Sequence, residues 1–596
     1  MDQERNLKGK NIEKIRDCLI YLYGVTIGKD AFAEIQKLLG NYRGSLSSQS
    51  NKNKINLSQR DAILITYGDQ LTEPSLSPLN TLGNFCHSYL DGLVSGVHIL
   101  PFFPSTSDDG FSVTDFKKVN PNLGSWKDIA TIGKHFRLMF DAVINHVSSQ
   151  SAWFQAFLKD DPQFRNYFIV VNDGVDLSQV VRPRALPLLT SFITPSGGKS
   201  VWTTFSSDQV DLNYHNPAVL LEIIDTILFY VAQGAEFIRL DAIAYLWKEI
   251  GTYCIHLPQT HRVIQLFRTV LDIVAPKVLL ITETNVPHIE NISYFGDSTN
   301  EAQLVYNFAL PPLVLYTMRC GDASVLSKWA AGLELPSNRV SFFNFLASHD
   351  GIGLNPVRGI LSDRGIEKLV EGTLMRGGLV SYKNNSDGTK SPYELNINYF
   401  DALSNLQDGE LEHLQIDRFM ASQAIMLSHV GVPGIYFHSM FGSSGWPEGV
   451  SLSGQNRTIN RQKLDLVTLK SELHDFTSRR YKVYSLYAQI LRARACSTAF
   501  HPLGNQLVMD FGNAIFALLR SSPDGYSQVL CLHNVSDNSQ FISLEHKELF
   551  KWVSEELVDL ITGNKLKINP KTGLRLEPYQ IFWLTRKQND NGRKHD

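Results

Sequence analysis

The chain has 596 residues, of which 43% are hydrophobic and 19% are charged, which is typical of a globular protein and not of a disordered or fibrous one. Its 56 Lys and Arg residues nearly balance its 59 Asp and Glu residues, so the formal net charge is −3. Without a basic block, nothing in the sequence attracts nucleic acid or an anionic membrane, and we expect neither as a partner. At roughly 150 residues per domain, four domains is a ceiling.

The termini and the cysteines indicate a soluble, cytoplasmic protein. Residues 1–10 are polar, and no stretch approaches the roughly 18 apolar residues of a membrane span. The six cysteines are scattered, with no CxxC pair and no histidine at metal-ligand spacing. We therefore predict reduced thiols, no metal site and no cofactor.

The N-terminal region has a helical pattern. Apolar residues recur at helical spacing over 12–22 and over 32–42, which predicts a pair of helices. A polar stretch at 44–54 follows and is predicted to be a flexible linker, so that residues 1–58 form an extension and linker. The pattern leaves open whether these helices pack on the main body or on a second subunit of a homodimer.

From about residue 61, short apolar runs alternate with longer helical segments, the pattern of parallel βα units. Eight runs are expected to be strands, and eight strands close a (β/α)8 TIM barrel, which we place at 59–498. The runs are Ala62–Thr66, Gly96–Leu100, Leu138–Ile144, Glu236–Leu240, Val278–Ile281, Leu304–Tyr306, Ser341–Leu346 and Gly434–Phe437.

The widest gaps between these runs predict insertions at about 148–211 and 351–401, on the face of the barrel where loops build sites. Beyond residue 499, short runs separated by Gly, Pro, Asn and Asp predict a C-terminal antiparallel β domain at 499–586. The charged tail, 587–596, is expected to be disordered.

Carboxylates fall at the ends of several predicted strands. Residues two apart on a strand point to one face, so Arg239 and Asp241 project together, and the arginine favours the ionised carboxylate that a nucleophile needs. Glu283 ends the fifth run, and His349 and Asp350 end the seventh. Any one of these could be a structural ion pair or a turn residue, but their joint position at strand ends indicates an active site.

Two carboxyl groups about 5–5.5 Å apart across a glycosidic bond perform retaining chemistry, one as nucleophile and the other as acid and then base. Asp241 and Glu283 fit these roles. Asp350 would stabilise charge or bind sugar hydroxyls, and His146 and His349 would donate to hydroxyls near the reacting carbon.

The motifs Asp141-Ala-Val-Ile-Asn-His146, Ile238-Arg-Leu-Asp-Ala242, Ile281-Thr-Glu283 and Ser348-His-Asp350 resemble, in order, the signature regions of the α-amylase clan. Val97–Phe103, Asp108–Phe111, Arg182-Pro-Arg184 and Asn307–Leu313 narrow the resemblance to its sucrose phosphorylase subfamily. The resemblance spans roughly residues 63–461. It implies a nucleophile, a general acid/base and a transition-state stabiliser at Asp241, Glu283 and Asp350.

The resemblance also implies a glucose pocket and a phosphate site. The glucose pocket would consist of Asp108, Phe111, His146, Arg239, His349 and Arg461, with Arg457 as the alternative to Arg461. Arg184 and Tyr393 match phosphate-contacting positions, and a guanidinium suits phosphate because of its forked geometry.

Two positions depart from the sucrose-specific enzymes, and three segments are similar to another branch. Glu394 stands where these enzymes carry Gln, and Asn285 stands where they carry His. The N-terminal extension, the stretch 184–189 and Lys383-Asn-Asn385 are similar to the glucosylglycerate and glucosylglycerol phosphorylase branch instead. Lys383 is a candidate cation for a glycerate carboxylate, whereas Glu394 would suit glycerol.

The sequence therefore predicts a retaining α-glucoside phosphorylase that transfers glucose from a small glucoside to inorganic phosphate through a β-glucosyl-aspartate. The alternatives are a sucrose or sucrose 6-phosphate phosphorylase, an α-glucoside hydrolase on the same barrel, and a non-catalytic binding barrel. The last should lack at least one of the three carboxylates, and this chain has them all.

Overall fold

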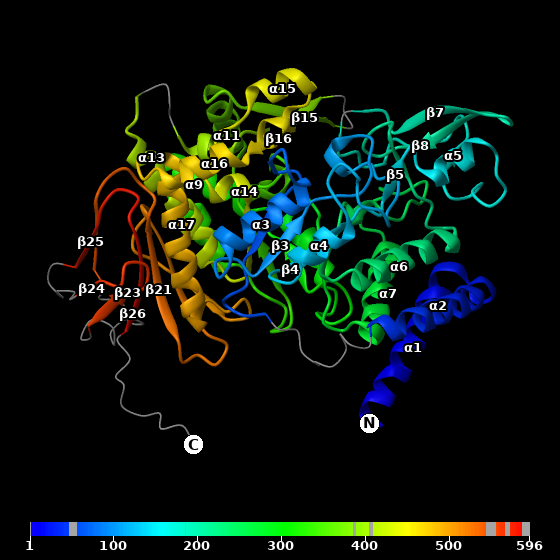
Figure 1. Cartoon of the computed structure of the whole chain (residues 1–596), viewed down its shortest axis with the longest axis horizontal. Coiled ribbons are helices and arrows are strands. Elements are labelled where there is room, and N and C mark those ends of the chain that lie inside the picture. The colour runs from blue at the N-terminus through cyan, green and yellow to red at the C-terminus, as the bar shows by residue number, and fades with distance from the viewer. Residues whose placement is uncertain are drawn as a thin grey trace.

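The computed structural model describes residues 2–46, 57–184, 186–385, 389–404, 409–543, 556–566 and 573–586. At its centre, eight parallel strands form a closed barrel in the order β1-β17-β13-β12-β11-β10-β4-β3 (Figure 1). Each predicted run overlaps one of these strands, so the (β/α)8 barrel is confirmed. The strands are β1 (Ile63–Thr66), β3 (Gly96–Ile99), β4 (Arg137–Ala142), β10 (Ala235–Leu240), β11 (Leu279–Thr282), β12 (Leu304–Tyr306), β13 (Ser341–Asn344) and β17 (Val432–Tyr436).

The barrel strands are buried along nearly their whole length, which is why they read as continuous apolar runs and not as alternating ones. The predicted run misses the first two residues of β17. Pro433 lies inside this strand, and because proline usually ends a strand, the run is predicted to begin after it. The next residue, Gly434, packs against the Phe343 ring, where an added Cβ would lie 2.5 Å from a ring carbon.

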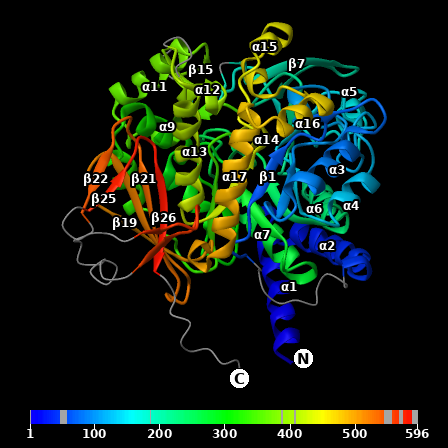
Figure 2. The same ribbon diagram turned by 60° about the vertical axis from the view of Figure 1, so that its left-hand side comes forward.

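Helices surround the barrel in both views (Figures 1 and 2). Several start with proline at the first turn, where its missing N–H costs nothing. The helices of this outer layer are α3 (Pro78–Leu90), α4 (Trp126–Ile132), α6 (Pro217–Ala232), α7 (Pro258–Val274), α8 (His288–Ile292), α9 (Leu310–Cys320), α10 (Ser324–Ala331), α13 (Glu412–Ser428), α14 (Phe437–Met440), α16 (Leu466–His474) and α17 (Arg479–Cys496). Helix α15 (Pro447–Ser453) lies outside this layer, at the top of the view in Figure 1.

Both predicted insertions contain small sheets of their own. After β4 the chain forms β5 (His146–Ser148), α5 (Ala152–Leu158), β6 (Val170–Val171), β7 (Leu189–Thr194), β8 (Gly197–Trp202) and β9 (Gln209–Asp211), with β5 paired to β9 and a sheet β6-β8-β7. After β13 it forms β14 (Ile352–Gly353), α11 (Asp363–Met375), β15 (Leu379–Asn384), β16 (Lys390–Asn396) and α12 (Tyr399–Leu403), with a sheet β14-β16-β15. A short pair joins β2 (Leu71–Thr72) to β18 (Leu464–Asp465).

The N-terminal helices α1 (Asp2–Tyr23) and α2 (Val25–Leu46) pack on the barrel of their own chain, against α6 and α7. The Tyr23 hydroxyl donates to the Tyr214 carbonyl at 2.9 Å, and the Arg262 guanidinium lies 4.7 Å from the centre of the Tyr21 ring. Helix α2 runs to Leu46, into the segment predicted to be a flexible linker, and the rest of that segment lies outside the described residues.

The C-terminal region forms an antiparallel sheet β19-β20-β21-β26-β23-β24, which confirms the predicted β domain. It lies on the other side of the barrel from α1 and α2 (Figure 1). Its strands, with the small pair β22–β25, are β19 (Asn505–Met509), β20 (Ile515–Ser521), β21 (Gln528–Asn534), β22 (Gln540–Ile542), β23 (Leu557–Asp559), β24 (Lys565–Leu566), β25 (Leu574–Leu576) and β26 (Ile581–Arg586). The predicted disordered tail, 587–596, lies outside the described residues. No helix in the described ranges is long and apolar enough to cross a membrane.

Candidate active site

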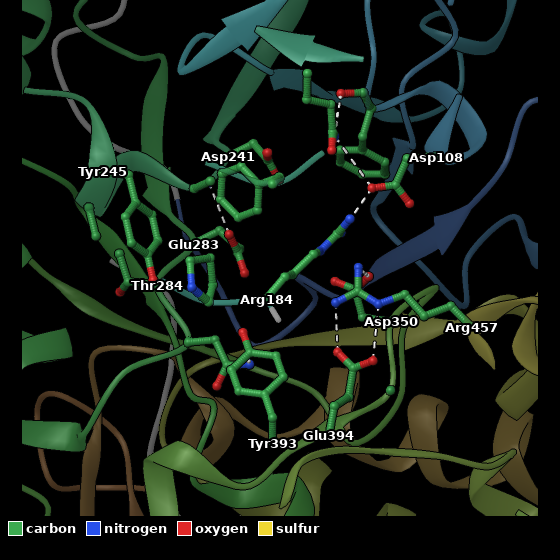
Figure 3. Close-up of a pocket in the computed structure, with 18 of the residues that line it drawn as sticks. Asp108, Arg184, Asp241, Tyr245, Glu283, Thr284, Asp350, Tyr393, Glu394 and Arg457 are labelled. Atoms are coloured by element: carbon green, nitrogen blue, oxygen red, sulfur yellow. Dashed lines mark hydrogen bonds and ion pairs between the residues drawn. The ribbon is translucent and has the colours of Figure 1, made fainter. Parts of the chain in front are cut away.

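A pocket lies at the carboxyl ends of the barrel strands, where both insertions contribute to its wall (Figure 3). The pocket and the open solvent at its mouth together have a volume of about 810 Å³. Of the residues expected to form the site, Arg239, Arg461 and Lys383 do not line it. The described residues that line it include Asp108, Phe111, His146, Arg184, Phe205, Gln209, Asp241, Tyr245, Glu283, Asn285, His349, Asp350, Tyr393, Glu394 and Arg457.

Arg239 lies directly behind the pocket and joins two carboxylates. Its Nη1 is 2.7 Å from Asp241 Oδ1 and 2.5 Å from Asp141 Oδ1, and the guanidinium is 2% exposed. Asp141 is bonded in turn to His98 Nε2 at 2.7 Å. Because residues 239 and 241 share one face of β10, the strand itself places this cation beside the Asp241 carboxylate.

Glu283 follows β11, the strand that pairs with β10. Its Oε2 accepts a 3.0 Å hydrogen bond from the Ala242 amide and lies 3.9 Å from Arg239 Nη2. Ala242 has a φ of 49°, a left-handed backbone conformation that alanine rarely adopts. Such strain is characteristic of functional turns, and here it accompanies the amide contact to the carboxylate.

The two carboxyl groups have raised pKa values. Burial, together with Glu283, Asp141 and Asp350, raises the pKa of Asp241 to about 8, although Arg239 lowers it. Burial also raises the pKa of Glu283, and Asp350 adds to that rise. The expectation that Arg239 simply keeps Asp241 ionised is therefore incomplete, because the ligand-free pair retains a proton. Arg239 contacts Asp241 more closely than Glu283, which favours the proton on Glu283.

Asp350 faces two arginines. Its Oδ1 is 2.6 Å from Arg457 Nη1 and 3.6 Å from Arg461 Nη2. Burial alone would raise the pKa of Asp350, but Arg457, His349 and Arg461 hold it well below its usual range. This carboxylate is therefore ionised at neutral pH, unlike the pair around Arg239.

Arg457 and Arg461, the two candidates for the glucose pocket, lie at different depths. Arg457 lines the pocket and clamps Glu394, with Nε and Nη2 at 3.0 and 2.6 Å from the two carboxylate oxygens (Figure 3). Arg461 lies behind it, donating to the His349 carbonyl at 2.8 Å and pairing with Asp109 at 2.6 Å.

Neutral aromatic groups form another part of the wall. The rings of Phe111 and His349 are stacked, with centroids 4.8 Å apart and planes 4° apart. His146 Nε2 lies 2.9 Å from the Phe111 carbonyl oxygen, to which it can donate. Burial lowers the pKa of both histidines, so each is neutral and has a single N–H to donate.

Of the residues predicted to bind phosphate and the acceptor, some line the pocket and one does not. Arg184 Nη2 is 3.0 Å from Asp108 Oδ2, and its guanidinium lies 5.7 Å from the centre of the Phe205 ring. Asn285 Nδ2 donates to the Tyr393 hydroxyl at 3.4 Å. Lys383, on β15, is half-buried and does not line the pocket.

Several pocket residues carry no sequence signal. Phe205 and Gln209 come from the first insertion, where Gln209 Nε2 donates to the Phe111 carbonyl at 3.1 Å.

Behind them, the buried Lys248 ammonium pairs with Asp211 at 2.6 Å and donates to Asn145 Oδ1 at 2.7 Å. Asn145 belongs to a recognised motif, but its partners lie about 66 and 103 residues away.

Comparisons with known proteins agree with this geometry. Residues 88–350 match the family model "Alpha amylase, catalytic domain". A glucosylglycerate phosphorylase of Spirochaeta thermophila is 50% identical over 96% of this chain and 98% of its own length. A glucosylglycerate phosphorylase of Escherichia coli is 43% identical over 96% of this chain and 100% of its own length.

A solved structure, sucrose 6F-phosphate phosphorylase from Thermoanaerobacter thermosaccharolyticum, shares the fold. It has a TM-score of 0.69 at 24% identity and covers 80% of this chain and 94% of its own. Fold and pocket thus define an α-amylase-type barrel enzyme with paired carboxyl groups. The chain belongs to the glycoside phosphorylases of the α-amylase family, in the group that includes glucosylglycerate phosphorylases.

Proposed function

We propose that this protein cleaves 2-O-α-glucosylglycerate with inorganic phosphate, giving α-D-glucose 1-phosphate and glycerate, and runs the reaction in reverse when phosphate is scarce. The observation that carries this choice is the identity to glucosylglycerate phosphorylases and the share of the chain over which it extends. Glucosylglycerate phosphorylases are 43–52% identical over 88–96% of the chain, whereas a glucosylglycerol phosphorylase of Marinobacter adhaerens is 28% identical over 69%.

In the first step, an Asp241 carboxylate oxygen attacks the anomeric carbon while the bond from that carbon to the glycerate oxygen breaks. Glu283, as the carboxylic acid, donates its proton to the departing oxygen. The contact of Arg239 with Asp241 supports this division of roles, because it favours the negative charge on the attacking group. A β-glucosyl-Asp241 ester and free glycerate result.

In the second step, a phosphate oxygen attacks the same carbon from the face that glycerate left. Glu283, now a carboxylate, takes the proton of the attacking P–OH group, and the ester bond to Asp241 breaks. Two inversions leave the product in the α configuration. Asp350, held ionised by its arginines, stabilises the positive charge that develops on the sugar in both steps.

The proposal is tested by incubating the protein with glucosylglycerate, glucosylglycerol or sucrose, with and without phosphate. We expect glucose 1-phosphate from glucosylglycerate, only when phosphate is present. Free glucose released at the same rate without phosphate would identify a hydrolase, and faster cleavage of sucrose or glucosylglycerol would overturn the assigned substrate. A cytoplasmic location and a homodimer stay predictions.

A further inference from the structure

The pocket is strongly acidic, although both acceptors of the proposed reaction are anions. The lining residues include two guanidinium groups, those of Arg184 and Arg457. A phosphate or a glycerate carboxylate must therefore be bound by a cation whose N–H groups are not all taken up by the carboxylates of the pocket. The carboxylates that line the pocket are Asp108, Asp241, Glu283, Asp350 and Glu394.

Arg457 is already engaged by two carboxylates of the pocket. Its Nε and Nη2 are bonded to the two oxygens of Glu394, and its Nη1 is paired with Asp350. Glu394 is 2% exposed, so releasing it would leave a buried carboxylate without its partner, at high cost. Arg457 is thus neutralised where it stands, and its role is to hold two pocket carboxylates in position.

Arg184 is in the opposite situation. Within the described part of the chain, its guanidinium has one ion-pair partner, Asp108, at its Nη2. The side chain is 29% exposed and extends into the pocket from the first insertion (Figure 3). In the described ranges its Nε and Nη1 have no hydrogen-bond acceptor, and a guanidinium can bind a phosphate or a carboxylate with two parallel hydrogen bonds.

Lys383 was expected to bind the glycerate carboxylate, but the structure places it elsewhere. It is half-buried on β15 and does not line the pocket, and burial lowers the pKa of its ammonium. Within the described residues, Arg184 is then the cation of the pocket that remains able to bind an anion.

We propose that Arg184, which the resemblance to the sucrose phosphorylases places at the phosphate site, also binds the carboxylate of glycerate during the reverse transfer, and that it thereby selects glycerate over glycerol. This rests on the proposed function. Glycerol differs from glycerate by a hydroxymethyl group in place of the carboxylate, so the ratio of transfer to these two acceptors isolates the contribution of the charge.

The test uses α-D-glucosyl fluoride as donor, because it forms the glucosyl-enzyme with release of fluoride and without phosphate. Transfer to phosphate, glycerate and glycerol is then measured for the wild type and Arg184→Gln. We expect kcat/KM for phosphate and for glycerate to fall together, by roughly 10- to 100-fold, as for loss of a charge-assisted hydrogen bond. Transfer to glycerol is expected to change by less than about threefold.

Two further variants sharpen the result. Arg182→Gln makes the same change two residues away on an exposed side chain that does not line the pocket, and it should leave all three acceptors unchanged. Arg184→Lys keeps the charge without the fork, and it should retain a preference for glycerate over glycerol that Arg184→Gln has lost.

Other outcomes overturn the inference. If Arg184→Gln loses transfer to phosphate alone, the carboxylate is bound elsewhere, and Lys383→Gln would then lose the preference for glycerate. Equal losses for all three acceptors, in a variant that unfolds at the wild-type temperature, would mean that Arg184 supports the glucosyl-enzyme and not the acceptor. A wild type that does not transfer to glycerate at all would instead refute the proposed function.

Discussion

Replacing Asp241 with asparagine should make the protein more stable at alkaline pH, while abolishing glucosyl transfer. The Asp241 carboxyl is buried beside other carboxylates, and its pKa is raised to about 8 in the folded protein. In the unfolded chain it ionises near pH ~3.9. Between these values the buried pair of Asp241 and Glu283 keeps a proton that the unfolded chain has released, so the free energy of unfolding of the wild type falls as the pH rises. Asparagine does not ionise, so the variant does not lose this part of its stability as the pH rises.

The size of the effect follows from the shift. Each pKa unit corresponds to about 1.4 kcal/mol, so a rise of about four units sets an upper limit of about 6 kcal/mol. Glu283 shares the proton, and the asparagine keeps only a weaker contact with Arg239, so we expect about half of that limit or less. For a chain of this length we expect the unfolding midpoint to rise by on the order of 3 °C.

The assay compares thermal unfolding of wild type and Asp241→Asn from about pH 5 to about pH 9. The difference should grow as the pH rises and level off above about 8. Asp108→Asn is a control of opposite sign, because Arg184 and Arg461 outweigh burial and lower the pKa of Asp108. That variant should be less stable than wild type at neutral pH, with a deficit that disappears in acid. A gain for Asp241→Asn that is absent, or equal at every pH, would refute the reasoning.

Three further substitutions test other contacts. Lys248→Met leaves Asp211 buried without its 2.6 Å partner and should cost about 3–5 kcal/mol, measured as a fall in the unfolding midpoint; an unchanged midpoint would contradict this. Glu283→Gln should slow phosphorolysis of glucosylglycerate by about 10²–10⁴-fold while sparing the first step with α-glucosyl fluoride, measured as the initial release of fluoride, because that leaving group needs no proton; equal losses in both would remove Glu283 as the acid. Arg457→Lys loses the fork to Glu394 and should lower kcat with the fold retained, as shown by circular dichroism, whereas wild-type kcat would deny the clamp a role.

The barrel could be predicted because its strands are buried on both faces and therefore leave local apolar runs. The positions of Asp241, Glu283 and Asp350 at strand ends followed from the assignment of these runs to the eight barrel strands. The starts of the strands were less certain, since a residue such as Pro433 reads as a breaker although the barrel accommodates it.

The partners within the site could not be predicted, because they depend on contacts between distant segments. The clamp of Arg457 on Glu394 joins residues about 63 apart, and nothing local in either segment indicates the other. The same holds for Gln209, which lies in a part of the first insertion that carries no motif. The sequence suggested Lys383 from its charge and from the resemblance of Lys383-Asn-Asn385 to the glucosylglycerate and glucosylglycerol branch, whereas its position outside the pocket lining is a property of the β15–β16 hairpin.

The most direct test of the central claim is to trap the glucosyl-enzyme. Glu283→Gln, given α-glucosyl fluoride without phosphate, forms the ester but lacks the base that deglycosylation needs, so the intermediate should accumulate. Mass spectrometry of peptides from the quenched protein should then show one added glucosyl residue on the peptide that contains Asp241, and addition of an anionic acceptor that needs no base, such as azide, should remove it. Glucosylation of a different residue, or turnover of the fluoride with no labelled peptide at any time, would contradict the proposed double displacement.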